Sequence, residues 1–227
     1  MIQGSVVNAA AIVAGTAVGL LLRKGIQERY QQTVLSGVAM SVGLIGVTMA
    51  LKTQNILLVI VSMVLGGLVG EFLDIDARLE RMGAWLTQRL GSQYGNVGQG
   101  FVTASLVFCV GAMAVVGSIQ DGMTDDAATL YAKATLDGIA SAVFASSMGA
   151  GVALSAVPVL LYQGAISLAA AAFGATLPTE AVTEMSAVGG LLIVGISMRM
   201  LNLGDIRIAN LLPAVFVAPL LVLFWPA

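Results

Sequence analysis

The residues with the most chemistry to offer lie close together in segment 117–138. This segment holds four of the chain's twelve acidic residues, Asp121, Asp125, Asp126 and Asp137, and apolar runs flank it on both sides. In so apolar a chain, such a cluster of carboxylates predicts either a solvated loop or a polar site within the membrane. Segment 117–138 is therefore the first candidate for a functional site.

Asp121 has polar neighbours that suit a pocket facing a substrate, namely Ser118 and Gln120. An equally simple interpretation is that the Asp-Gly pair at 121–122 forms an ordinary turn. Asp125 and Asp126 follow a threonine and instead predict the acidic first turn of a short surface helix.

Asp137 is the strongest single candidate. A carboxylate at the centre of a membrane helix costs about 3 kcal/mol to insert, so a deeply placed one has a function or a partner. Alternatively, Asp137 caps the start of the helix that we expect at 136–156 by accepting backbone N–H groups. The two interpretations are compatible, because a helix start aimed into a cavity also binds ligands.

The uncharged segment 138–179 carries further hydroxyl and amide groups that would contact a substrate. They also fit close packing of membrane helices, which uses small and hydroxyl residues. These candidates are Ser141, Ser146, Ser147 and Gln163.

Three polar residues near the expected span ends complete the set. Asn210 is a candidate ligand-binding residue, although the sequence Asn-Leu-Leu-Pro at 210–213 also predicts a helix start. We expect Glu71 and Glu184 to reach the membrane interface.

Composition decides the broad class. The chain of 227 residues is 58% hydrophobic and 10% charged, and its mean hydropathy is +0.97. Soluble domains carry about 25% charged residues, so we predict an all-α integral membrane protein whose partners include the lipid bilayer. The net charge of −2 gives no sign of nucleic-acid binding.

The chain offers little for enzymatic chemistry. It has no histidine, which is the commonest general base and metal ligand, and its one cysteine, Cys109, lies in an apolar run. No nucleophile elbow, phosphate-binding glycine loop or Cys-x-x-Cys motif is present. We therefore predict no catalytic residues, no metal site and no cofactor beyond a coupling Na⁺ or H⁺.

Apolar runs of membrane-spanning length recur along the chain. An amphipathic surface helix at 74–90 and a linker at 91–100 separate two groups of them. The uncharged segment 138–179 would extend about 63 Å as one helix, so it must double back, near Gly149–Gly151 or Pro158, as a full or a re-entrant hairpin. Eight spans are expected, at 2–22, 33–51, 56–73, 101–119, 136–156, 157–175, 182–201 and 208–224.

Basic residues predict the orientation, because Lys and Arg concentrate in cytoplasmic loops. Eight of the ten fall on one side of the expected membrane, and only Lys52 and Lys133 on the other. Both termini, and segment 117–138, are therefore expected on the outer side.

An internal repeat organises the spans. Moved by 101 positions, Val-Leu-Ser-Gly-Val-Ala at 34–39 falls on Thr-Leu-Asp-Gly-Ile-Ala at 135–140, and Tyr30 falls on Tyr131. Repeat one (1–73) then matches repeat two (101–175), with extra spans at 182–225 in one polytopic membrane domain. Because each repeat has three spans, the second is inverted, which is an architecture typical of secondary transporters.

Four motifs taken together resemble a known family. Gly-Ser-Ile-Gln-Asp-Gly at 117–122, Leu-Asp-Gly at 136–138, Tyr-Gln-Gly at 162–164 and Asn-Leu-Leu-Pro at 210–213 are similar to those of the bacterial family of uncharacterised multi-pass membrane proteins that includes YqgA and YdfK. The resemblance covers nearly the whole chain. It implies a protein of the bacterial cytoplasmic membrane for which transport is at most a suggested role, and it brings no substrate or site residues.

The function favoured by these observations is secondary transport of a small solute or ion by alternating access. Asp121 and Asp137 would coordinate a cation or carry a proton, and the hydroxyl and amide groups would contact the substrate. A channel, and a non-transporting scaffold or signalling partner that docks through 74–90, remain alternatives. Close helix packing in a short chain also suggests a homodimer.

Overall fold

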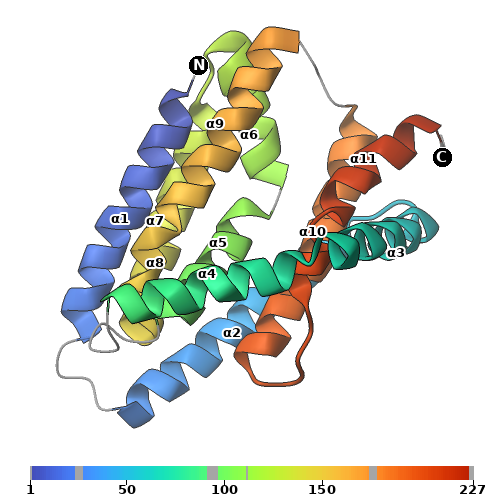
Figure 1. The fold of residues 1–227 in the computed structure, drawn as a ribbon. Coiled ribbons are helices and arrows are strands. Elements are labelled where there is room, and N and C mark those ends of the chain that lie inside the picture. The colour runs from blue at the N-terminus through green and yellow to red at the C-terminus, as the bar shows by residue number, and fades with distance from the viewer. Residues whose placement is uncertain (1, 24–27, 91–96, 111, 174–177, 225–227) are drawn as a thin grey trace. The chain divides into compact units, whose positions relative to one another are not determined.

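The computed structural model describes residues 2–23, 28–90, 97–110, 112–173 and 178–224. Over these ranges the chain is helical and contains no β-strand (Figure 1). Two compact units emerge from the contacts. The first comprises Met1–Val38, Glu80–Cys109 and Met113–Thr176, and the second Ala39–Leu79, Val110–Ala112 and Leu177–Ala227.

Helices that are long and apolar enough to cross a membrane make up much of the described chain. Five helices are long and apolar enough to cross a bilayer, or up to six if one bent pair counts as a single span. The all-α membrane prediction is therefore confirmed at this level. The spans found are Gln3–Arg23, Gln32–Ala50, Ile56–Leu73, Gly151–Ala172 and Thr179–Met200, with Val97–Cys109 and Met113–Thr124 as the bent pair.

The first unit is built around two helices, α1 (Gln3–Arg23) and α7 (Ala128–Met148), which lie side by side along their length (Figure 1). Their contacts advance together, from Gly4 against Leu130 to Gly19 against Ala142, so the two helices run parallel. The rest of this unit comes from α9 (Ala156–Phe173), α5 (Val97–Cys109), α6 (Ala112–Thr124), α8 (Gly151–Leu154), the start of α2 (Glu28–Ala50) and most of α4 (Ile75–Leu90).

Glycines set the spacing between α1 and α7. A Cβ atom on Gly15 would lie 2.0 Å from the carbonyl oxygen of Gly138, and one on Gly19 would lie 2.2 Å from that of Ala142. Both clashes are with backbone, which cannot swing away as a side chain can. Small residues at these positions let the two backbones approach, as is usual between membrane helices.

Two breaks interrupt the apolar helices of the first unit. α5 and α6 are bent by 62° relative to each other. α7 ends at Met148, and the next residue, Gly149, has a φ of +91° that few other residues adopt. The expected break near Gly149 is therefore confirmed. Pro158 does not break the chain, because it lies in the first turn of α9, where its missing N–H has no helical partner to lose.

The second unit contains the end of α2, α3 (Ile56–Leu73), α10 (Thr179–Met200), the 3₁₀ turn η2 (Ile208–Leu211) and α11 (Ala214–Phe224). Close glycine contacts recur, since a Cβ on Gly66 would lie 2.2 Å from the backbone nitrogen of Ala214. The span expected at 208–224 is divided between η2 and α11.

Glu184 holds the turn between α2 and α3 in place by hydrogen bonds. Its side chain on α10 is 3% exposed and accepts hydrogen bonds from Thr53 Oγ1 (2.6 Å), Gln54 N (2.7 Å) and Asn55 N (3.2 Å). The side chain of Glu184 is therefore buried against this turn. Burial is tolerated because backbone and hydroxyl donors satisfy the carboxylate.

Two expected boundaries are wrong. The span placed at 136–156 starts earlier, because α7 begins at Ala128. The linker placed at 91–100 ends earlier, because α5 begins at Val97, while 91–96 lie outside the described residues. The helix expected at 74–90 is confirmed as α4.

Filling the contact between α1 and α7 should destabilise the protein. Gly15→Ala forces a methyl group into the Gly138 carbonyl, and overpacking of this kind costs about 1–3 kcal/mol. Thermal unfolding in detergent should show a lower midpoint. Gly37→Ala is the matched control, because nothing lies within 4 Å of its Cβ position and Ala favours the helix by about 0.5–1 kcal/mol. Equal midpoints for the two variants would contradict the packing described.

Replacing Glu184 should loosen the α2–α3 turn. Glu184→Gln turns one acceptor oxygen into a donor that faces other donors, and each buried group left unsatisfied costs about 1–3 kcal/mol. We expect a lower unfolding midpoint than for Glu180→Gln, an exposed glutamate on the same helix. Tryptic cleavage after Lys52, in the α2–α3 turn, should also become faster in Glu184→Gln but not in Glu180→Gln.

Candidate ligand-binding site

Asp137 lies inside α7 rather than at its start. The helix begins at Ala128, nine residues earlier, so the capping interpretation is wrong. The carboxylate is buried in the first unit, with the residue 7% exposed. A carboxylate in the middle of an apolar helix needs partners from its own helix or its neighbours, and it has both.

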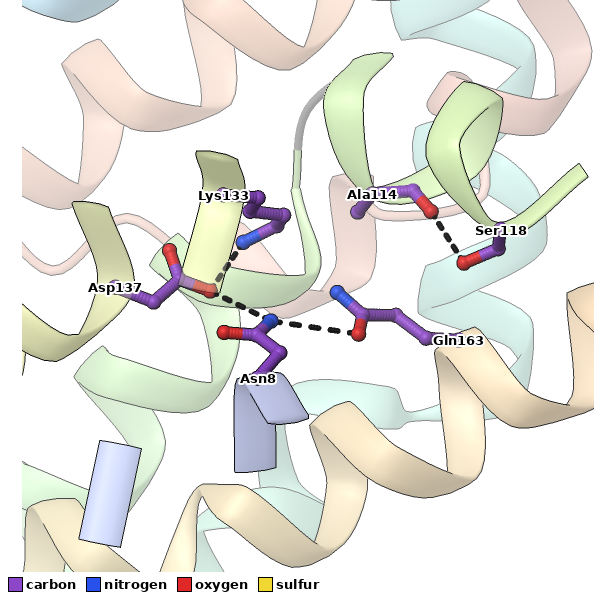
Figure 2. A network of polar contacts seen from close by, with 6 residues as sticks. All are labelled: Asn8, Ala114, Ser118, Lys133, Asp137 and Gln163. Atoms are coloured by element: carbon purple, nitrogen blue, oxygen red, sulfur yellow. Dashed lines mark hydrogen bonds and ion pairs between the residues drawn. The ribbon is translucent and has the colours of Figure 1, made fainter. Parts of the chain in front are cut away.

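Three side chains from three helices meet Asp137 directly or through one another (Figure 2). Lys133, one turn earlier on α7, forms an ion pair with Asp137 Oδ2. Asn8 of α1 donates from Nδ2 to the same oxygen (2.9 Å) and to Gln163 Oε1 of α9 (3.3 Å). We call Asn8, Lys133, Asp137 and Gln163 the polar cluster.

The polar cluster is closed off from the surroundings. Asn8 and Gln163 are 0% exposed, and Lys133 is 6% exposed. Taking an ion pair out of water costs several kcal/mol per ion, and the mutual attraction of the charges offsets this only with good geometry and further hydrogen bonds. Asn8 supplies such a bond.

Hydrogen-bond chemistry fixes how the two amides are turned. An ionised carboxylate only accepts, so Asn8 must present its NH₂ group to Asp137. The second hydrogen of that NH₂ then requires an acceptor, which is the amide oxygen of Gln163. Gln163 therefore presents Oε1 rather than Nε2 as the partner of Asn8.

Three buried atoms of this region have no hydrogen-bond partner among the described residues. They are Gln163 Nε2, Asn8 Oδ1 and Ser141 Oγ, the last one turn beyond Asp137 on α7. Buried polar groups are nearly always satisfied in folded proteins, and an exception calls for a specific explanation such as a bound molecule. The polar cluster therefore has unused hydrogen-bonding capacity among the described residues.

Lys133 was missed as a site residue by the sequence-based analysis, which counted it among the basic residues of the outer side. Its spacing of four from Asp137 was the available signal, because residues at i and i+4 face each other on a helix. Its ammonium also lies 5.9 Å from the centre of the Phe108 ring. Asn8 was not among the predicted site residues either.

Asp121 is a second buried carboxylate in the first unit. It lies inside α6 with 1% exposure, and Oδ2 accepts the backbone N–H of Gly4 at 3.2 Å. The interpretation as an Asp-Gly turn is therefore wrong. Ser118 is buried on the same helix and donates to the carbonyl oxygen of Ala114 (2.6 Å, Figure 2).

The remaining candidates of segment 117–138 lie outside the polar cluster. Gln120 is exposed, and its oxygen accepts from Thr129 Oγ1 at 2.7 Å. Asp126 accepts the N–H of Ala128 at the start of α7 (3.0 Å). Asp125 and Asp126 lie before α7 begins, so the prediction that they form the acidic first turn of a short surface helix is wrong.

Two serines of α7 beyond Ser141 are half-buried. Ser146 donates to the carbonyl oxygen of Val143 at 2.7 Å, whereas Ser147 Oγ has no partner among the described residues. Neither has a recorded bond to the polar cluster.

Asn210 belongs to the second unit, where it joins two helix ends. Its Oδ1 accepts the N–H of Asp76 at the start of α4 (2.7 Å), and its Nδ2 donates to Glu71 (2.7 Å). The capping interpretation was right in kind, but the helix capped is α4 rather than one starting at Asn210. Arg199 also pairs with Asp76 at 3.3 Å.

Acidic, cysteine and histidine side chains do not gather into metal-binding groups of three anywhere in the described ranges. The polar cluster combines two amides with one positive and one negative charge. Such a set can hold a small polar molecule by hydrogen bonds and charge, deep among apolar helices.

Comparison with known proteins identifies the family. The sequence profile of a family described as "Protein of unknown function (DUF554)" matches residues 3–223. The chain belongs to this family. The match includes both units and every residue of the polar cluster.

Two relatives in the DUF554 family are similar over nearly their full lengths. The "Uncharacterized membrane protein YdfK" of Bacillus subtilis (strain 168) is 30% identical over 223 residues, which is 96% of this chain and 95% of the relative. The "Uncharacterized protein YqgA" of Escherichia coli (strain K12) is 28% identical over 232 residues, covering 100% and 99%. The resemblance drawn from the motifs is confirmed. No solved structure matches the chain.

Removing one charge of the pair should cost more stability than removing both. Lys133→Met leaves Asp137 buried without its counter-ion, and breaking a buried pair in this way costs about 3–5 kcal/mol. Adding Asp137→Asn to the same chain should restore most of the lost stability, because no uncompensated charge remains. Thermal unfolding of the single and double variants measures this. A double variant no more stable than Lys133→Met would contradict the pairing.

Proposed function

We propose that this DUF554 protein is a secondary transporter that moves a small solute or ion across the bacterial cytoplasmic membrane by alternating access. The observation that carries the proposal is the polar cluster, a buried ion pair with unsatisfied amide atoms among apolar helices. Intramembrane ionisable residues mark substrate and ion pathways.

Stability alone is a poor reason for the polar cluster. Replacing a buried ion pair by well-packed apolar residues is often neutral or stabilising. If these residues served only to hold α1, α7 and α9 together, leucines at the same positions would stabilise the contact equally well. A ligand site accounts for both the charges and the unsatisfied atoms.

The helix boundaries support the inverted repeat. Moved by 101 positions, α2 (Glu28–Ala50) covers 129–151 and overlaps α7, and α3 (Ile56–Leu73) covers 157–174 and overlaps α9. α1 moves onto 104–124, the end of α5 together with α6. This supports a 3+3 repeat in which the first span of the second copy is the bent one, and discontinuous helices at such positions are typical of transporter sites.

Helix directions support eight spans. α7 accompanies α1 in parallel from Gly4 to Gly19, so α7 crosses the membrane if α1 does. In the inverted topology the first and fifth spans run the same way. α9 runs opposite to α1. Gln163 of α9 contacts Asn8 of α1. One turn later on α9, Ser167 packs against Gly122, whose neighbour Asp121 bonds to Gly4, one turn earlier on α1. This favours a full hairpin over a re-entrant one.

The remaining features complete the proposal. Both termini lie outside, as the basic residues predict. A H⁺ or Na⁺ gradient is coupled through the buried carboxylates Asp121 and Asp137. Two chains form a homodimer through their small-residue helix faces.

Reconstitution tests the transport function. The purified protein in proteoliposomes is given pooled amino acids, organic acids, sugars and inorganic cations under an imposed pH or Na⁺ gradient, and the trapped contents are measured. We expect saturable, gradient-dependent uptake of one solute. The double variant Lys133→Met with Asp137→Asn should lose uptake while remaining folded, and Gln32→Glu, at an exposed glutamine of α2, should keep it.

Other outcomes would replace the transporter. Unitary currents in planar bilayers would show a channel. A complete lack of flux, together with loss of partner binding when residues 75–90 are deleted, would show a scaffold that docks through α4.

A further inference from the structure

We propose that the polar cluster binds a small zwitterion of the amino-acid type, with the ligand carboxylate between Lys133 and Gln163 and the ligand ammonium against Asp137 and Asn8. The inference deepens the proposed function by naming the substrate class. Only the statement that this ligand is transported rests on the proposed function, because binding can be tested separately.

The unsatisfied atoms specify what a ligand must offer. Gln163 Nε2 is a donor without an acceptor, and Asn8 Oδ1 is an acceptor without a donor among the described residues, with both side chains 0% exposed. A bound molecule that satisfies both therefore carries an acceptor group and a donor group. A purely anionic or purely cationic ligand satisfies only one of them.

The two charged side chains lie on the same sides of the polar cluster as the two unsatisfied atoms. In Figure 2 the amide nitrogen of Gln163 is turned toward Lys133, and the amide oxygen of Asn8 is turned toward the side of Asp137. Lys133 and Asp137 contact each other, and in this view the free donor of Gln163 is drawn on the Lys133 side and the free acceptor of Asn8 on the Asp137 side. A carboxylate complements the first pair and an ammonium group the second.

Net charge favours the same ligand. Lys133 and Asp137 together carry no net charge, so the empty site is neutral within apolar surroundings. A zwitterion keeps the occupied site neutral, whereas a lone carboxylate or amine would leave one uncompensated charge in a medium of low dielectric constant.

Ligand screening by thermal shift tests the substrate class on the full chain in nanodiscs. Each of the twenty common L-amino acids is added, and stabilisation by mass action reports binding. We expect at least one small neutral amino acid to raise the unfolding midpoint saturably. Its two analogues that lack one charge should give no shift, for example propionate and ethylamine as the counterparts of L-alanine.

One variant tests the placement of the ligand carboxylate without removing the ion pair. Gln163→Glu keeps the size of the side chain but places a carboxylate against that of the ligand, so the affinity should fall about tenfold or more. Gln32→Glu makes the same change at an exposed glutamine and should leave the affinity unchanged. The double variant Lys133→Met with Asp137→Asn should fold and bind no amino acid.

The outcomes separate this inference from the proposed function. If no amino acid binds, while another solute is transported and depends on the polar cluster, the zwitterion is wrong and the transporter stands. If an amino acid binds but is not transported, the site is right and the transporter is wrong. Equal shifts from one-charge analogues, or full affinity in Gln163→Glu, would overturn the zwitterion site.

Discussion

The need to compensate charge inside an apolar bundle constrains the whole first unit. Lys133 and Asp137 balance each other on α7, but the carboxylate also needs Asn8 from α1, which in turn meets Gln163 from α9. A shift of one residue along α1 would rotate Asn8 by about 100° and remove it from this contact. The close glycine contact of Gly15 with α7 fixes the register that holds Asn8 in place.

The two units use polar residues for different ends. In the second unit, buried or half-buried polar groups join helix ends, as Glu184 does at the α2–α3 turn and Asn210 at the start of α4. In the first unit, amide and hydroxyl atoms around an ion pair have no hydrogen-bond partner among the described residues. Unsatisfied buried groups, as in the first unit, are expected where a ligand completes the hydrogen bonding. We therefore propose that a ligand binds in the first unit.

Particular residues explain which boundaries could be predicted. The helix at Ile56–Leu73 was predicted to the residue, because an unbroken apolar run lies between Asn55, which caps it, and Asp74, which ends it in a left-handed conformation. The start of α7 was placed eight residues late, because Lys133 and Asp137 made its first half look like a loop. Hydropathy treats each charge separately, whereas the two charges compensate each other one turn apart.

Composition and pattern by themselves determined the all-α membrane class and most of the apolar helices, and they marked Asp137 as a candidate site residue. The sequence also marked Gln163 as a candidate, though without its partner. Only the tertiary structure decided that Asn8 and Lys133 complete the polar cluster, that Asp121 and Glu184 are buried, and that Gln120 is exposed. The physical reason is that hydropathy reflects local composition, while partners 129 or 155 residues apart meet only through helix packing.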